Sequence, residues 1–302
     1  MDKYCVDGWV STQVDNGMYG MPQAGWVAND HLIPQLLAAG YKETGRTSGL
    51  FCHHTNNIIF VLIVDNFLIQ FTTEAALTHL INTLQQHYTI TIDRTATKSC
   101  GMQLDWEYGE GHVTLSMPGY VEKALNRFTH TASTKPQHAP HPWTPPNYRA
   151  QIQYAHDQGD STPLDNQGIA LLQQINGTFL YYAWVINNTM LVPLGTLAAS
   201  QTKGTEKTME ATIQLLRHAA TNPDAAIRFY KSDTTLYAHS NTSYLSEPQA
   251  RSRVGGFFYL GNSNEPADKP TPNGPVHVES RIMKQIMATT SKAEIGALFL
   301  LE

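Results

Sequence analysis

Two short apolar runs joined by an Asp-Asn pair place the strongest constraint on how this chain folds. Residues 58–64 and 67–71 are rich in β-branched and aromatic side chains, and Asp65 and Asn66 stand between them. Side chains of this kind favour strands, and Asp and Asn tolerate the backbone conformations of a tight turn. The pattern predicts a β-hairpin with Asp65 and Asn66 at its tip.

The rest of the chain alternates between helical and strand patterns. A helix is expected at residues 29–39, with a bend at Pro34 and a stop at Gly40, and another at 73–88, capped by Thr73. Further helices are expected at 120–128, 169–183, 205–221 and from 291 onward, and further strands at 102–108, 112–116, 235–240, 254–260 and 275–283. Residues 129–168 are punctuated by proline and are expected to form an extended strap rather than a core.

Composition limits the classes of function. The formal charge is −5, the pI is about 6.2, and only 15% of residues are charged. Nucleic-acid binders normally carry a basic footprint, so these values weaken that class, although a local basic groove remains compatible with them. Three dispersed cysteines fit a reducing compartment. The N-terminus shows no apolar leader, and the longest apolar run, 58–64, is too short to cross a membrane. We therefore expect an intracellular protein, in cytoplasm or nucleus, without a membrane partner.

The hairpin tip has a chemical as well as a structural interpretation. A carboxylate held rigidly between two strands is a suitable ligand for a hard cation such as Mg²⁺. Two-metal phosphoryl transfer needs several converging carboxylates, and Asp65 alone does not supply them. The alternative is an ordinary turn in which Asp65 and Asn66 serve only the backbone. The contiguous run Cys52-His53-His54 suggests a zinc site, but it lacks the usual ligand spacing.

Four motifs around the hairpin occur in a recognisable order. They are GMYGMPQAG at 17–25, CGMQLD at 100–105, MPGYVEKAL at 117–125 and GTFLYYA at 177–183. Together with the hairpin they resemble the reverse transcriptase of copia-type retrotransposon polyproteins. The resemblance implies that Asp65 binds a catalytic metal, Mg²⁺ in that family, and that Pro22, Gln23 and Gly25 line the template and incoming nucleotide.

The resemblance also marks departures from the family pattern. Asn66 stands where the family has a second metal-binding aspartate, and a neutral amide is the poorer Mg²⁺ ligand. The family's first catalytic aspartate lies well before the Tyr-Gly motif, so the first palm strand and most of the fingers are expected to be missing. Lys123 and Arg127 lie four residues apart on the expected 120–128 helix. In a thumb they would contact phosphates, and otherwise they form a solvated helix face.

The last part of the chain resembles the start of a ribonuclease H fold. The matching segments are HSNTSY at 239–244, RSRVGG at 251–256 and SKAE at 291–294. Asn241 replaces the first catalytic aspartate and Glu294 matches the catalytic glutamate, although Ser291 and Glu294 also fit a helix-capping box. The remaining acidic ligands are expected beyond residue 302. Arg251 and Arg253 either bind a nucleic-acid backbone or protect an edge strand.

These observations predict an α+β protein. We expect a partial palm and thumb, a helical connection, and a truncated ribonuclease H-like sheet with one helix. The expected ranges are 1–128 for the partial fingers, palm and start of the thumb, 129–168 for the strap, 169–225 for the helical connection and 232–302 for the ribonuclease H-like part.

The resemblance implies an RNA-directed DNA polymerase with ribonuclease H acting on an RNA/DNA template-primer. We expect a catalytically inactive fragment with weakened Mg²⁺ binding, and completion by another chain stays open. The alternative is a non-catalytic remnant that binds nucleic acid or protein.

Overall fold

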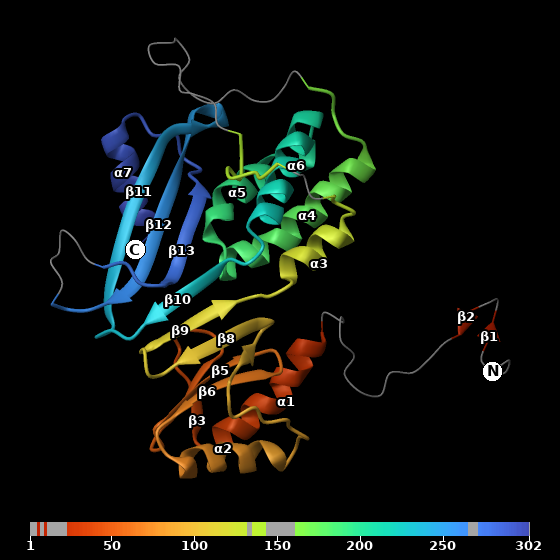
Figure 1. Cartoon of the computed structure of the whole chain (residues 1–302). Coiled ribbons are helices and arrows are strands. Elements are labelled where there is room, and N and C mark those ends of the chain that lie inside the picture. The colour runs from red at the N-terminus through yellow and green to blue at the C-terminus, as the bar shows by residue number, and fades with distance from the viewer. Residues whose placement is uncertain are drawn as a thin grey trace. The chain divides into compact units, whose positions relative to one another are not determined.

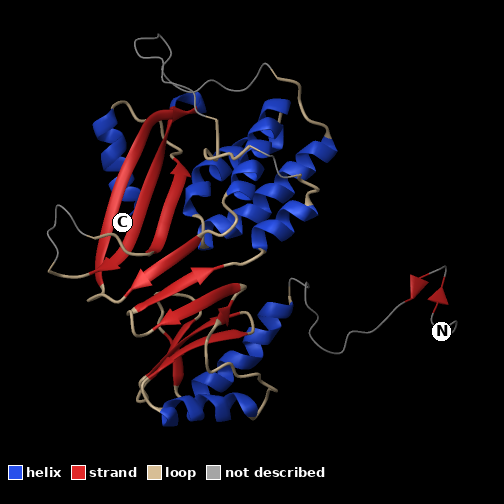
Figure 2. Cartoon of the chain, viewed as in Figure 1, coloured by secondary structure: helices blue, strands red, loops and turns tan. Residues whose placement is uncertain are grey.

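The computed structural model describes residues 5–6, 9–10, 23–131, 135–142, 161–264 and 271–301. The chain divides into two compact units, Met1–Cys100 and Gly101–Glu302, which are described separately. Both units combine helices with antiparallel sheets (Figures 1 and 2). The expected α+β class is confirmed, while the assignment of palm, thumb and ribonuclease H parts, and their boundaries, stays a prediction.

The first unit is a four-stranded antiparallel sheet with two helices. Its elements are α1 (Ala24–Ala38), β3 (Tyr41–Glu43), β4 (Leu50–His53), β5 (Ile58–Ile63), β6 (Asn66–Phe71) and α2 (Glu74–Gln85), with the two-residue strands β1 (Cys5–Val6), β2 (Trp9–Val10) and β7 (Lys98–Ser99). The strand order is β3-β4-β5-β6. Alternate residues Ile58, Phe60 and Leu62 are buried and belong to one core with Leu36 of α1 and Leu80 of α2. The period-2 pattern therefore places one face of the hairpin in the core.

Local signals set the ends of both helices in this unit. Gly40 follows α1 with φ +91°, a conformation that glycine adopts at little cost, so the expected stop is confirmed. Helix α1 begins at Ala24, earlier than expected, and contains Pro34. The Thr73 hydroxyl accepts a hydrogen bond from the Ala76 amide at 3.3 Å, which confirms the expected cap of α2.

The second unit begins with a small sheet and a group of helices. The elements are β8 (Met102–Glu107), β9 (His112–Ser116), β10 (Ala226–Tyr230), α3 (Tyr120–Arg127), α4 (Asn166–Val185), α5 (Leu191–Ser200) and α6 (Glu206–Thr221), with 3-10 turns η2 (Asn188–Met190) and η3 (Gln201–Lys203). Strand β10 pairs with β9 across more than one hundred residues of sequence. Phe179, Tyr182, Leu194 and Leu215 are almost completely buried in the core that the four helices share.

Residues 135–142, one of the described parts of the expected strap at 129–168, lie along α6. The Gln137 amide donates to the Thr221 hydroxyl at 2.9 Å, the Gln137 carbonyl lies 3.2 Å from His218 Nδ1, and Gln214 Nε2 donates to the Ala139 carbonyl at 3.1 Å. This part of the segment is extended and hydrogen-bonded to the surface of α6, whereas the last residues of the expected strap are helical, because α4 begins at Asn166.

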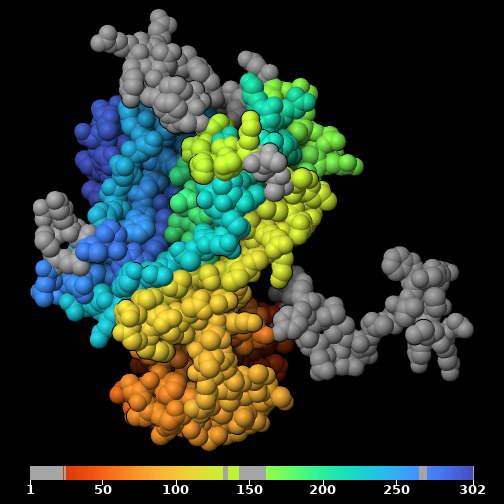
Figure 3. Space-filling view, in the orientation of Figure 1, coloured from red at the N-terminus to blue at the C-terminus, as the bar shows by residue number. Residues whose placement is uncertain are grey.

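The C-terminal part of the second unit is a three-stranded antiparallel sheet in the order β11-β12-β13. Its elements are β11 (Thr235–Glu247), the turn η4 (Pro248–Ala250), β12 (Arg251–Gly261), β13 (Pro275–Ile282) and α7 (Thr290–Leu301). One face carries Val254, which packs with Met283 and Ala297 of α7. The other face carries Arg253, which contacts Thr196 of α5. The space-filling view shows this sheet, in blue, packed beside the green and teal helices (Figure 3). None of the described helices combines the length and apolar character needed to cross a bilayer.

Candidate functional site

The hairpin tip is a two-residue turn with an unusual backbone. Ile63 pairs with Asn66, so the turn consists of Val64 and Asp65, one residue earlier than predicted, and Asn66 opens β6. Val64 has φ +59° and is 67% exposed. A β-branched residue with positive φ is strained, and such strain is concentrated at functional sites. The turn therefore places Asp65 at the exposed end of the hairpin, directly after a residue whose side chain does not favour its backbone conformation.

Asp65 and Asn66 contact one another directly. The Asn66 side-chain amide donates to Asp65 Oδ1 at 3.2 Å, and both residues are exposed within the chain. The pair therefore combines the neutral amide of Asn66 with the carboxylate of Asp65. Among the residues that the structure describes, no three His, Cys, Asp or Glu side chains gather in a way that could hold a metal ion. The described residues do not form the carboxylate set that two Mg²⁺ ions require.

The expected template-contacting residues lie at the start of α1. Gln23 is the N-cap of this helix, and its carbonyl accepts from the Val27 amide at 3.0 Å. Gly25 lies in the first turn, where an added Cβ would meet no atom within 4 Å, so this backbone is open to approach. Pro22 and the remainder of the Tyr-Gly motif before Gln23 lie outside the described residues.

Lys123 and Arg127 lie on α3 in the second unit, four residues apart, and both are exposed. The Arg127 guanidinium lies over the Phe128 ring at 5.5 Å from its centroid. Both cations are therefore accessible for phosphate contacts, and the alternative of a solvated helix face fits the same geometry.

The two expected ribonuclease H residues lie on opposite sides of the C-terminal sheet. Asn241 pairs with Gly255 in an antiparallel register that also pairs Ser243 with Arg253. Directly opposed residues project from the same face, so Asn241 shares the face of Arg253. Glu294 lies on α7, which covers the other face. The structure does not bring these two side chains together.

The capping interpretation of Glu294 is wrong. Helix α7 begins at Thr290, and the Thr289 hydroxyl accepts from the Lys292 amide at 3.2 Å. Ser291 therefore lies inside the helix rather than at its N-cap.

Arg253 serves neither of the roles expected for it. Its strand β12 is the central strand of the sheet, and its side chain is 5% exposed in an ion pair with Glu247, where Nε lies 2.7 Å from Oε1. The guanidinium also donates to the Thr196 hydroxyl at 2.9 Å. An added Cβ at Gly195 would lie 2.8 Å from Arg253 Nη1. Arg253 therefore connects the sheet to α5, and Gly195 leaves the space for it.

The Cys52-His53-His54 run forms a hydrogen-bonded cluster in which the ring nitrogens of His53 are occupied. His53 Nε2 lies 3.1 Å from the Ala39 carbonyl, and Nδ1 accepts from the amides of Thr55 at 3.1 Å and Asn56 at 2.9 Å. Burial, and to a lesser degree the imidazoles of His54 and His79, lower the pKa of His53. These contacts join His53 to the end of α1 at Ala39 and to the turn at Thr55 and Asn56. Because both ring nitrogens of His53 are used in them, the geometry does not support the zinc interpretation.

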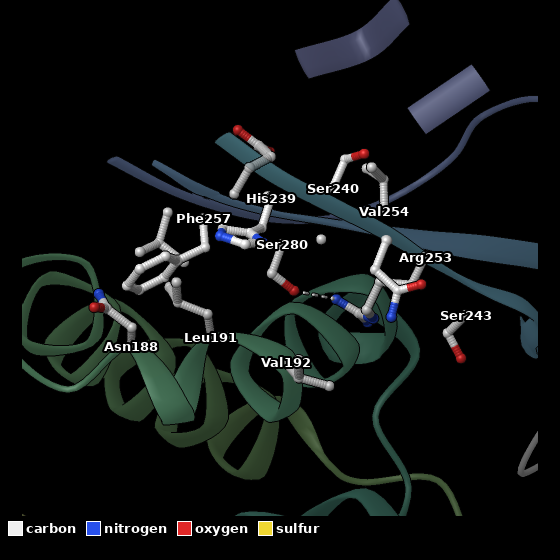
Figure 4. Close-up of a pocket in the computed structure, with 15 residues that line it drawn as sticks. Asn188, Leu191, Val192, His239, Ser240, Ser243, Arg253, Val254, Phe257 and Ser280 are labelled. Atoms are coloured by element: carbon white, nitrogen blue, oxygen red, sulfur yellow. Dashed lines mark hydrogen bonds between the residues drawn. The ribbon is translucent and has the colours of Figure 1, made fainter. Parts of the chain in front are cut away.

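A cavity of about 400 Å³ lies between the C-terminal sheet and the start of α5, and sequence reasoning did not anticipate it. Leu191 and Val192 line it on the helix, and His239 and Phe257 line it on the sheet (Figure 4). Asn241 also lines it. Its existence depends on the packing of segments distant in sequence, which local patterns do not reveal.

Comparison with known families gives a match to part of the chain. Residues 7–141 match the family model described as "Reverse transcriptase (RNA-dependent DNA polymerase)", which spans slightly less than half of the chain. No solved structure matches the chain. The matched segment contains Val64, Asp65 and Asn66 of the hairpin and also Gln23 and Gly25. Asn241 and Glu294 lie outside it. The match supports a reverse transcriptase-like origin for this segment.

Proposed function

We propose that the chain derives from a copia-type RNA-directed DNA polymerase with ribonuclease H, and that it no longer performs the polymerase reaction efficiently. The family match at residues 7–141 supports the polymerase origin. The observation that supports the loss of activity is the Asp65-Asn66 pair. The side-chain nitrogen of Asn66 donates a hydrogen bond to the Asp65 carboxylate, at a position where the family has a second carboxylate.

The chemistry of the family explains why this pair matters. A primer 3′ hydroxyl attacks the α-phosphate of a nucleotide, and two metal ions stabilise the attacking and leaving oxygens. Each ion needs anionic oxygen ligands to offset its charge. Asp65 supplies one carboxylate and Asn66 supplies none, so metal affinity and transition-state stabilisation both fall. Each 1.4 kcal/mol lost corresponds to about a tenfold lower rate.

The proposed origin extends to the C-terminal sheet. The HSNTSY and SKAE motifs support a ribonuclease H-like ancestry for β11 and α7. Asn241 lacks a carboxylate, and Glu294 lies on the helix that covers the opposite face. We therefore expect no cleavage of the RNA strand of an RNA/DNA hybrid, measured on a labelled hybrid duplex with Mg²⁺ or Mn²⁺.

Primer extension tests the polymerase proposal. The whole chain is incubated with an RNA template, a labelled DNA primer, nucleotides and Mg²⁺ or Mn²⁺, beside an Asp65→Asn variant. The proposal predicts that the two proteins give the same low yield. Robust template-dependent extension by the unmodified chain, lost in Asp65→Asn, would overturn it.

A second function is favoured by the exposed cations of α3. Lys123 and Arg127 are positioned to contact phosphates without any catalysis, which fits a remnant that only binds nucleic acid. Binding through phosphates weakens linearly with the logarithm of salt concentration. We expect a Lys123→Ala/Arg127→Ala variant to bind a hybrid duplex more weakly and with a shallower salt slope. Lys207→Ala, an exposed cation on α6, is the matched control. An affinity for the hybrid duplex that changes neither with salt concentration nor in the Lys123→Ala/Arg127→Ala variant would exclude this function.

A further inference from the structure

Two adjacent glycines of β12 differ in what surrounds them. An added Cβ at Gly256 would lie 2.7 Å from Leu301 of α7, so close helix packing accounts for this glycine. At Gly255 the nearest atom to an added Cβ is the Asn241 carbonyl oxygen at 3.9 Å. Neither crowding nor a positive φ requires glycine there. Glycine inside a strand often marks a place where a ligand approaches the backbone.

The open space above Gly255 belongs to the cavity beside α5. Gly255 lies between Arg253 and Phe257 on the sheet face that lines this cavity. The volume of about 400 Å³ falls within the range of roughly 300–1,000 Å³ that is typical of small-molecule sites. Leu191 and Val192 form the helical wall, and Phe257 projects from the sheet (Figure 4). The exposed surface of the walls is therefore mostly apolar, and it includes the rings of Phe257 and His239.

Charge and hydrogen bonding narrow the ligand class. The positive charge of Arg253 is compensated by Glu247 at 2.7 Å, and the negative charge of Glu279, which also lines the cavity, is compensated by Arg281 at 3.4 Å. With both charges paired, the cavity favours an uncharged ligand. Asn188 uses its side-chain nitrogen on the Ala183 and Trp184 carbonyls, at 2.9 and 3.3 Å, which leaves its carbonyl as an acceptor. Asn241 uses its side-chain oxygen to accept from the Thr242 amide at 2.8 Å, which leaves its nitrogen as a donor.

We propose that this cavity binds a neutral heteroaromatic ring of nucleobase size. Apolar walls and the Phe257 ring suit a flat ring, and the Asn241 donor and the Asn188 acceptor suit a ring edge that carries both kinds of group. A free nucleoside and an unpaired base of a single strand share this chemistry. The proposal rests on the second unit alone and is independent of polymerase activity.

Calorimetric titration of the whole chain tests the proposal. The probes are the four ribonucleosides and single-stranded RNA decamers of each base. Similar affinity for nucleoside and decamer would support a free-nucleoside site, and tighter, salt-sensitive decamer binding would support an unpaired base of a strand. Saturation by none of these probes at millimolar concentration would overturn the proposal.

Variants that fill the cavity test whether the ligand binds there. Gly255→Val places a side chain in the open space, and we expect affinity to fall at least tenfold. Val192→Trp, at a residue that is 39% exposed on the helical wall, fills the cavity from the other side if Gly255→Val does not fold. Val276→Trp, at a 51% exposed position of β13 that does not line the cavity, is the control. Unchanged affinity in a folded cavity-filling variant, or equal loss in the control, would contradict the proposal.

Discussion

Replacing Arg253 with methionine should destabilise the second unit strongly. The Arg253–Glu247 pair is 2.7 Å long, with side chains 5% and 7% exposed, so the substitution leaves a buried carboxylate without its cation. Breaking a buried pair in this way costs about 3–5 kcal/mol. The Thr196 hydroxyl also loses its donor, which weakens the connection between β12 and α5.

Urea unfolding provides the measurement. With a denaturant slope near 3 kcal/mol/M, a loss of 3–5 kcal/mol lowers the midpoint by about 1–2 M. Because the chain has two units, hydrogen exchange of β12 and α5 peptides is needed to assign the loss to the second unit. Arg251→Met, a partly exposed arginine two residues earlier on the same strand, is the matched control and should change the midpoint little.

A double variant separates the ion pair from the packing. Arg253→Met with Glu247→Leu removes both charges, and we expect it to recover most of the lost stability, because paired apolar replacements of buried ion pairs are often close to neutral. The reasoning is refuted if the single variant loses less than about 1 kcal/mol, or if the double variant is no more stable than the single one.

Three further perturbations test the first unit, each by its urea midpoint. Thr73→Ala removes the α2 cap and should cost about 1 kcal/mol, whereas an unchanged midpoint would show that the 3.3 Å bond contributes nothing. Gly40→Ala should cost about 1–3 kcal/mol, because φ is +91° and the new Cβ would lie 2.6 Å from His54 Cε1; equal stability would contradict this. Burial lowers the pKa of His53 below 6.5, so the unfolded chain binds the proton more readily and stability should fall as pH drops below about 6.5. His53→Gln should flatten that dependence, and a persistent slope would assign it to other groups.

The sequence predicted the elements whose signals are local. The hairpin at 58–71 followed from two apolar, β-rich runs and the turn residues between them, and the cap at Thr73 from a single side chain. Helix α5 was missed because Pro193 and Gly195 weaken its pattern. Proline is tolerated in a first turn, and Gly195 is explained by the approach of Arg253. Strand β10 was missed because its pairing with β9 depends on contacts more than one hundred residues apart.

The candidate site was predictable only in part. Asp65 and Asn66 were singled out from the hairpin and its neighbouring motifs, but the strain at Val64 is visible only in the backbone. The separation of Asn241 from Glu294 depends on strand register and on the face that α7 covers, since a shift of one residue reverses every side chain. The cavity over Gly255 likewise depends on tertiary packing.

Manganese binding shows whether the turn at Asp65 still holds a metal ion, and it does not depend on the rest of the polymerase. Electron paramagnetic resonance measures free Mn²⁺ in titrations of the unmodified chain, Asn66→Asp and Asp65→Asn. We expect weak Mn²⁺ binding by the unmodified chain and at least tenfold tighter binding by Asn66→Asp. In Asp65→Asn the affinity should fall by no more than a few-fold from that of the unmodified chain. Tight binding by the unmodified chain that Asn66→Asp leaves unchanged and Asp65→Asn abolishes would contradict this expectation, since Asp65 and Asn66 would then form a working metal site as they stand.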